Sequence, residues 1–190
     1  MMTSRPYIAL SCLLFVLILL ACNAGVDRKN GNETYKCFTF TKRVTLPGDP
    51  VYIYDSISGD ISGWWDHSFS ETPARLYLEA KPGGGFYEIF DESGDGALHA
   101  TVTYAHRGKL LRFDGPLGLA GQAFHMVTTY SFEPVGTDST SLAVEIHAAG
   151  EIDDNIPGIV EKVWEHFIFE RFKPYIEHEA SLAALSFYRD

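Results

Sequence analysis

The chain is poor in cysteine and in basic residues, and each shortage excludes a class of protein. Three cysteines in 190 residues cannot supply the disulfide framework of a small secreted scaffold. Lysine and arginine number 15 against 25 aspartates and glutamates, a formal net charge of −10. This excess of acid argues against a nucleic-acid partner and against electrostatic docking onto anionic lipid. No Cys-x-x-Cys or His-x-x-x-His spacing occurs, so no metal site is predicted from a local motif.

The first 22 residues have the layout of a secretory signal. Arg5 supplies the positive charge, Tyr7 to Leu20 is almost wholly apolar, and Ala21 precedes Cys22. A transmembrane anchor needs about 20 apolar residues, and this run is shorter and interrupted by a serine. Plain secretion, with a cut such as one after Ala24, remains the alternative reading.

Leu19-Leu20-Ala21-Cys22 resembles a bacterial lipobox, and Asn23 follows the cysteine. The resemblance implies cleavage before Cys22, lipidation of its thiol and an extracytoplasmic domain tethered to the cell membrane. In a host with two membranes, Asn23 implies the outer one. Loss of residues 1–21 removes one basic residue, which leaves 14 basic against 25 acidic.

The predicted domains are a signal peptide at 1–21, a lipidated flexible spacer at 22–36, one domain at 37–178 and a tail at 179–190. The 169 residues left after cleavage are enough for one domain with its own core. Cys37 is then the one unmodified thiol. We expect it to be a buried strand residue, because no neighbouring residue supplies a base.

Alternation between turn signals predicts a run of strands, with helical signals on either side. Asp49-Pro50 predicts a capped helix start after the first strand, and Ile61 to Trp65 predicts a second short helical turn. The predicted strands are 37–46, 75–80, 86–90, 98–106, 109–113, 123–133 and 140–149. Apolar residues at three- and four-residue steps from Ile156 to Ile176 predict a long final helix, capped by the acidic run at Asp153 and kinked at Pro174.

Four stretches in this order resemble the START/Bet v-like (SRPBCC) superfamily, in particular the branch similar to the C-terminal domain of activators of the heat-shock chaperone ATPase. They are Trp64-Trp65, Lys81 to Phe86 with Glu88, Lys109 to Phe113, and Tyr130 to Pro134 with Gly136-Thr137. The resemblance implies an α+β helix-grip fold, in which a curved antiparallel sheet wraps a long C-terminal helix and two short helices follow the first strand. Because a signal sequence precedes the domain, stimulation of a cytosolic chaperone is not expected.

The resemblance also implies a hydrophobic ligand cavity between the sheet and the final helix. Alternation places Phe124, Met126, Thr128, Tyr130 and Phe132 on one face of their strand, and Leu142, Val144, Ile146 and Ala148 on one face of the next. The predicted lining residues are Trp64, Trp65, Phe86, Phe90, Tyr104, Phe113, Met126, Tyr130 and Trp164. Hydroxyls of Tyr104, Thr128 and Tyr130 could orient a ligand, while the alternative is that the aromatic residues simply fill a core.

Few residues suggest catalysis. Glu88 alternates with two aromatics, and an inward carboxylate there would have a pKa raised by desolvation and could act as a base. Asp66-His67 could pair as a base and its orienting group, but no nucleophile motif accompanies it. His125 and His147, with Glu145, share an outer face as a weak zinc candidate.

The predicted function is therefore binding of a small hydrophobic molecule by a membrane-tethered extracytoplasmic domain, with no cofactor and no metal. A cyclase- or dehydratase-type enzyme using the same cavity is one alternative. A protein-interaction module at the cell envelope is another. The sequence does not decide whether the protein is an enzyme, and it favours binding over catalysis.

Overall fold

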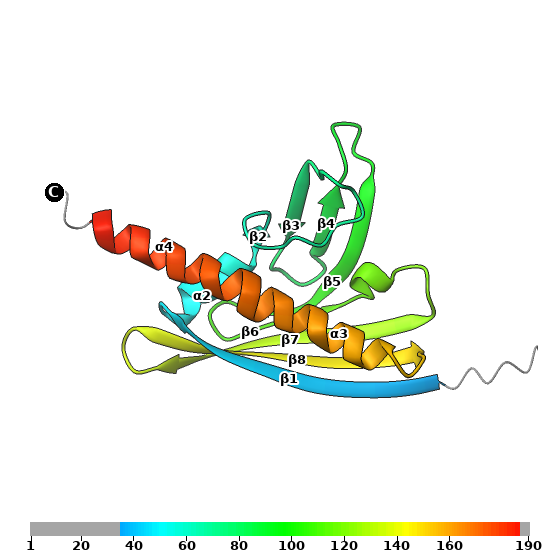
Figure 1. Cartoon of the computed structure of the whole chain (residues 1–190). Helices are drawn as coiled ribbons and strands as arrows, with labels where there is room; N and C mark the ends of the chain where they lie inside the picture. Colours follow the sequence, from blue (N-terminus) through cyan, green and yellow to red (C-terminus); the bar gives the residue numbers. More distant parts are fainter. Residues whose placement is uncertain (1–34, 187–190) are drawn as a thin grey trace, which may run out of the picture. The chain divides into compact units, whose positions relative to one another are not determined.

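An eight-stranded antiparallel sheet curves around a long C-terminal helix in the computed structural model, which describes residues 35–186 (Figure 1). The strand order is β1-β8-β7-β6-β5-β4-β3-β2, so every strand from β2 to β8 pairs with its neighbour in sequence. The strands are β1 (Tyr35–Pro47), β2 (Gly59–Asp60), β3 (Arg75–Leu78), β4 (Gly85–Ile89), β5 (Gly96–His106), β6 (Leu110–Asp114), β7 (Phe124–Val135) and β8 (Ser139–Glu151). The fold is α+β, as predicted.

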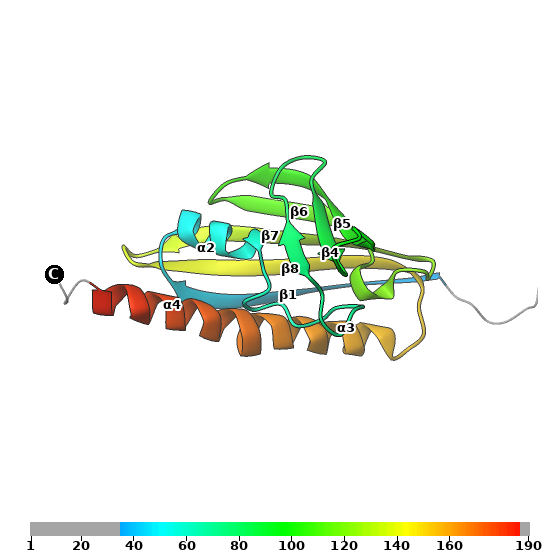
Figure 2. The ribbon, with the colours of Figure 1, turned by 90° about the horizontal axis from the view of Figure 1, so that it is seen from above.

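The helix predicted after the first strand is present as α2 (Pro50–Ile57), which packs on β7 and β8 (Figure 2). Asp49 caps it: Oδ1 accepts hydrogen bonds from the backbone N–H groups of Val51 at 2.8 Å and Tyr52 at 2.9 Å. The second short helix is not formed. Ile61 begins a single turn, in which its carbonyl accepts from the N–H groups of Trp64 and Trp65, and the chain then continues as a loop.

The C-terminal helix comprises α3 (Ile156–Glu165), a π-helical stretch (His166–Phe172) and α4 (Lys173–Ser186). The N-cap residue is Asn155, whose side chain makes no capping bond, and Oδ1 of Asp153 accepts from the N–H groups of Asn155 at 2.7 Å and Ile156 at 3.1 Å. The wider turns of the π-helix end at Phe172, and α4 begins at Lys173, so the helix continues through Pro174. None of the helices within residues 35–186 is long and apolar enough to cross a membrane.

The concave face of the sheet carries the core, as the alternation predicts. The predicted inner faces of both long strands, Phe124 to Phe132 and Leu142 to Ala148, are buried. Aromatic contacts join this core to the C-terminal helix: Trp65 stacks on Phe167 with ring centroids 3.8 Å apart, and Trp64 meets Phe172 at 4.8 Å. Because this cluster, the sheet and the helix belong to residues 35–186, this part of the chain has a complete core of its own.

Two β-bulges in β5 change which of its side chains face the core. Phe86 and Tyr87 pair with Ala100 and Leu98, which leaves His99 as an extra residue. Val102 and Tyr104 pair with Phe113 and Arg112, which leaves a second extra residue between them. A bulge shifts the alternation that follows it, so sequence periodicity alone cannot assign faces along this strand.

The turn before β4 needs glycine at two positions, for two different reasons. Gly83 has a φ of +78°, with open space where a Cβ would lie. Gly84 has no such φ, but a Cβ there would overlap the carbonyl oxygen of Glu79. The first position needs glycine for its backbone angle, and the second needs it for the close approach of two chain segments.

We therefore predict unequal losses of stability when these glycines are replaced by alanine. Gly83→Ala should lower the free energy of unfolding by about 1 kcal/mol, the cost of a left-handed backbone. Gly84→Ala should cost about 3 kcal/mol, because backbone must move to relieve the overlap. Gly158→Ala, in open space within α3, should raise stability by about 0.5 kcal/mol. Urea unfolding of the three variants tests the order, and equal losses at positions 83 and 84 would contradict it.

Candidate ligand cavity

A cavity of about 560 Å³ lies between the first turns of the C-terminal helix, the loop before β3 and the inner face of the sheet. The loop contributes Trp65 to Glu71, the segment between β6 and β7 contributes Pro116 to Leu119, and α3 contributes residues from Ile159 to Trp164. His99, Met126 and Phe167 complete the lining. This volume lies within the range of small-molecule sites, about 300–1,000 Å³.

The deep part of the cavity is apolar. Trp65, Met126, Trp164 and Phe167 line it, and each is almost completely buried. Trp65 stacks on Phe167, and Trp164 meets the edge of the same ring at 5.9 Å. These contacts give the floor fixed aromatic faces, which suit an apolar ligand.

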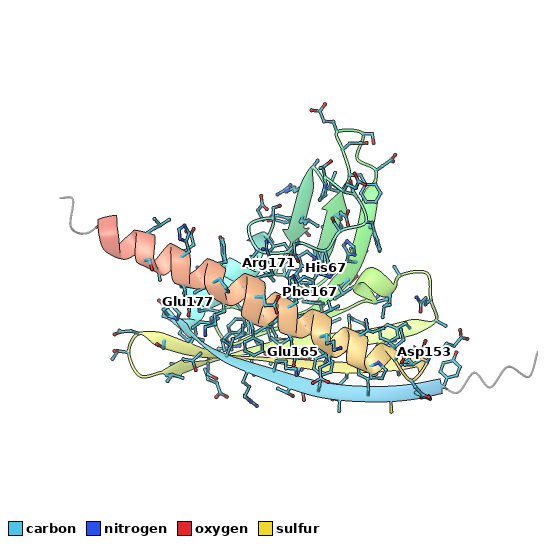
Figure 3. The ribbon with its side chains drawn as sticks, in the orientation of Figure 1. His67, Asp153, Glu165, Phe167, Arg171 and Glu177 are labelled. Atoms are coloured by element: carbon cyan, nitrogen blue, oxygen red, sulfur yellow. The ribbon has the colours of Figure 1, made fainter. Side chains whose placement is uncertain are left out.

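The rim is open to solvent and more polar. Asp66, His67 and Glu71 are exposed, as are the apolar side chains of Phe69 and Ile159. Figure 3 shows His67, Phe167 and Arg171 where the middle of the C-terminal helix passes this loop. A ligand entering here would pass charged groups before it reached the aromatic floor.

Of the nine predicted lining residues, the structure brings three to the cavity: Trp65, Met126 and Trp164. Four others are buried in the solid core: Trp64, Phe86, Phe113 and Tyr130. Tyr130 packs between Phe113 and Trp164, and burial raises the pKa of its hydroxyl. Thr128 is also buried in the inner face, and its Oγ1 has no hydrogen-bond partner among the described residues.

Two residues that were predicted to line the cavity do not line it. Tyr104 is 45% exposed because the second bulge of β5 turns it to the outer face of the sheet. Phe90 lies beyond the end of β4, where it is half-buried and does not line the cavity. Side chains alternate between the two faces only along an unbroken strand, and the bulge interrupts β5 just before Tyr104.

Glu88 points inward as predicted, but its chemistry differs from the prediction. Its carboxylate is fully buried and accepts three hydrogen bonds: from the N–H of Phe69 at 2.9 Å, from the N–H of Ser70 at 2.7 Å and from Nε2 of His99 at 2.8 Å. Burial by itself raises the pKa of Glu88, but the three hydrogen bonds outweigh it and lower the pKa overall. Glu88 is therefore an ionised anchor for the loop and does not serve as a free base.

His99 is the polar residue that the sequence analysis missed. The bulge turns it inward beside Ala100, and its ring lies 5.0 Å from the rings of both Phe69 and Phe86. Because Glu88 is ionised, Nε2 carries the proton and donates it. Nδ1 has no hydrogen-bond partner within residues 35–186, which leaves it as the free polar edge of a cavity residue. Neither alternation nor a motif marks this histidine.

The Asp66-His67 pair is joined by a histidine from the C-terminal helix. Nδ1 of His67 lies 3.1 Å from Oδ1 of Asp66, and Nε2 of His166 lies 3.1 Å from Oδ1 and 2.9 Å from Oδ2. Nδ1 of His166 contacts Glu170 at 2.9 Å, and Nε of Arg171 lies 3.1 Å from Oδ2 of Asp66. These carboxylates raise the pKa of His166. Partial burial favours a higher pKa for Asp66, but the two histidines and Arg171 lower it overall.

The other candidate residues lie apart from the cavity. His125 and His147 are exposed on the outer face, where each contacts a carboxylate of its own, Asp114 and Glu145, at 3.2 Å. Cys37 is exposed, against the expectation of a buried thiol, because it faces outward from the edge strand β1. Cys22 and the signal segment lie outside the described residues.

No family model and no curated protein matches the chain. Among solved structures, the chain resembles a protein from Mesorhizobium loti (TM-score 0.54, 17% identity, 74% of this chain and 98% of that one). It also resembles an uncharacterised protein from Rhizobium leguminosarum (0.53, 13%, 76% and 97%) and a protein of unknown function from Staphylococcus aureus (0.54, 12%, 77% and 98%). At these identities the likeness shows the fold alone.

The role of Glu88 as a loop anchor predicts a large and pH-dependent loss of stability when it is replaced. Glu88→Ala should lower the free energy of unfolding by about 3–5 kcal/mol at neutral pH, and Glu88→Gln by about 1–3 kcal/mol. The pKa of Glu88 is lower in the folded state, so its contribution is complete above the unfolded value of about 4.3 and is lost as the pH falls through the folded value.

Urea unfolding at several pH values below 6 measures this effect. The difference between wild type and Glu88→Gln should shrink on acidification, whereas the exposed control Glu145→Gln should stay within about 0.5 kcal/mol of wild type. A difference that does not change with pH would show that Glu88 is not ionised in the folded protein.

Proposed function

We propose that this chain binds a small, mostly apolar molecule in the cavity, in the manner of a helix-grip domain of the START/Bet v-like superfamily. The observation that carries the proposal is the 560 Å³ space between sheet and helix, with buried aromatic residues on its floor. The curved sheet around a C-terminal helix is the arrangement expected of that superfamily. The cavity lies at the α3 end of the C-terminal helix, and the core toward α4 remains packed.

The cavity favours a ligand with one polar group. Its deep lining is apolar apart from His99, whose position is set by Glu88 behind it. A hydroxyl or amide of a ligand could donate to the free Nδ1 while the rest of the molecule contacts Trp65, Trp164 and Met126. A single polar group in a fixed position within an apolar site orients a ligand and gives specificity.

Catalysis in the same cavity is the second candidate, and the Glu88–His99 pair is the observation in its favour. A carboxylate that fixes the tautomer of a histidine is the usual support of a general base. The base of a cyclase- or dehydratase-type reaction would then be His99, in place of the earlier candidate Glu88. The tether proposed at Cys22 would put either activity at the cell envelope, on the extracytoplasmic side.

Native mass spectrometry of residues 23–190, incubated with an organic extract of the producing cells, tests the proposal. An added mass should appear and should fall at least tenfold in Val163→Phe, which fills the cavity from α3. Val135→Phe, the same change at an exposed strand end, should leave it unaltered. A product mass that disappears in His99→Gln would instead indicate catalysis. No added mass, or equal retention by both variants, would contradict a ligand-binding cavity and favour an interaction module.

The proposed tether has a separate test. When the full chain is expressed in a bacterium with radiolabelled palmitate, label should enter the protein, which should fractionate with membranes. Cys22→Ser should abolish labelling, and Cys12→Ser should not change it, because that cysteine precedes the expected cut. Labelling that survives Cys22→Ser, or is absent from wild type, would exclude the lipoprotein assignment.

A further inference from the structure

We infer that Asp66, His67 and His166 form a binding site for one divalent transition-metal ion, with Zn²⁺ as the natural occupant. The three residues offer two imidazole nitrogens and one carboxylate oxygen, and these atoms all lie within 4.8 Å of one another. Two histidines and a carboxylate are a common protein ligand set for zinc, with the fourth position left to water or a ligand. This inference does not depend on the proposed ligand-binding function.

The distances agree with tetrahedral coordination. Zinc lies about 2.0–2.1 Å from nitrogen and oxygen ligands, so the ligand atoms of a tetrahedral site lie about 3.3 Å apart. Oδ1 of Asp66 is 3.1 Å from Nδ1 of His67 and 3.1 Å from Nε2 of His166. Two of the three distances between ligand atoms are therefore already near the required length. Only the distance between the ligating nitrogens of His67 and His166 has to adjust.

The surroundings support His166 as a ligand. Its Nδ1 contacts the carboxylate of Glu170 at 2.9 Å, which leaves Nε2 directed toward Asp66. Metal-bound histidines usually donate their second N–H to a carboxylate in this way, which fixes the ring and makes the ligating nitrogen more basic. Phe167, the next residue, packs against the rings of both His67 and Trp65 and so restricts the rotamers near the site.

One contact disfavours binding of a metal ion at this site. Nε of Arg171 lies 3.1 Å from Oδ2 of Asp66 and so supplies a positive charge to the same carboxylate. Coordination through Oδ1 would leave Oδ2 to Arg171, so the two cations can share Asp66 at the cost of mutual repulsion. Removing the guanidinium should therefore tighten metal binding. If the cluster were only a network of ion pairs, the same change would weaken the cluster.

An ion held here would border the ligand cavity, because Asp66 and His67 also line it. The site joins two segments 100 residues apart, the loop before β3 and the π-helical stretch of the C-terminal helix. An ion would thus fasten the helix to the loop that forms the cavity rim.

The test is titration of the full chain, in a mild detergent, with Zn²⁺ by calorimetry and with Co²⁺ by its visible d–d absorption. We expect one ion per chain and the intense absorption of tetrahedral cobalt. His67→Asn and His166→Asn should each abolish saturable binding. Glu170→Gln should weaken it 10- to 100-fold, the usual effect of losing a carboxylate behind a ligating histidine.

The matched control is the double variant His125→Asn/His147→Asn, which removes two exposed histidine–carboxylate pairs from the outer face and should bind like wild type. Arg171→Gln should bind roughly fivefold to tenfold more tightly. Circular dichroism of each variant shows whether it is folded. Absence of saturable binding, binding that survives His166→Asn, binding lost in the outer-face variant, or weaker binding in Arg171→Gln would each overturn the assignment.

Discussion

The candidate site depends on one buried carboxylate. Glu88 has no contact with solvent, and a charge in that position is tolerable only when several donors surround it. Two of the donors are backbone N–H groups of the loop before β3, and the third is His99 on β5. The same three bonds therefore attach the loop to the sheet, orient the histidine and lower the pKa of the acid. This anchor acts together with Trp65, which packs against Phe86 of β4, to hold the loop on the sheet.

Some aromatic residues of the inner surface fill the core, and others line the cavity. Tyr130 contacts both Phe113 and Trp164, and these three buried rings belong to the filled core. Between α3, the loop before β3 and the segment before β7, a space remains that is lined by Trp65, Met126, Trp164 and Phe167. Aromatic residues thus fill a core in one part of this surface and line a cavity in another.

The polar groups lie at two depths. His99 is buried in the wall, with one nitrogen committed to Glu88 and the other free. Asp66 and His67 lie at the rim, where water can reach them, and His166 contacts Asp66 from the C-terminal helix. Binding of an apolar molecule and binding of an ion at the rim would therefore use separate atoms of the same loop, and each would restrict the position of that loop. If both sites are occupied as proposed, this shared segment would couple them without direct contact between their ligands.

The sequence by itself determined seven of the eight strands, the starts of α2 and the C-terminal helix, and the inner faces of β7 and β8, whereas the two-residue strand β2 was not predicted. These features depend on local periodicity and on hydrogen bonds between near neighbours, as with Asp49 and Asp153. Only the tertiary structure decided the site. The bulges of β5 turned His99 inward and Tyr104 outward, since a single extra residue reverses alternation and leaves no mark in composition. Likewise His166 meets Asp66 across 100 residues because the helix crosses the sheet, and no spacing along the chain encodes a distance created by packing.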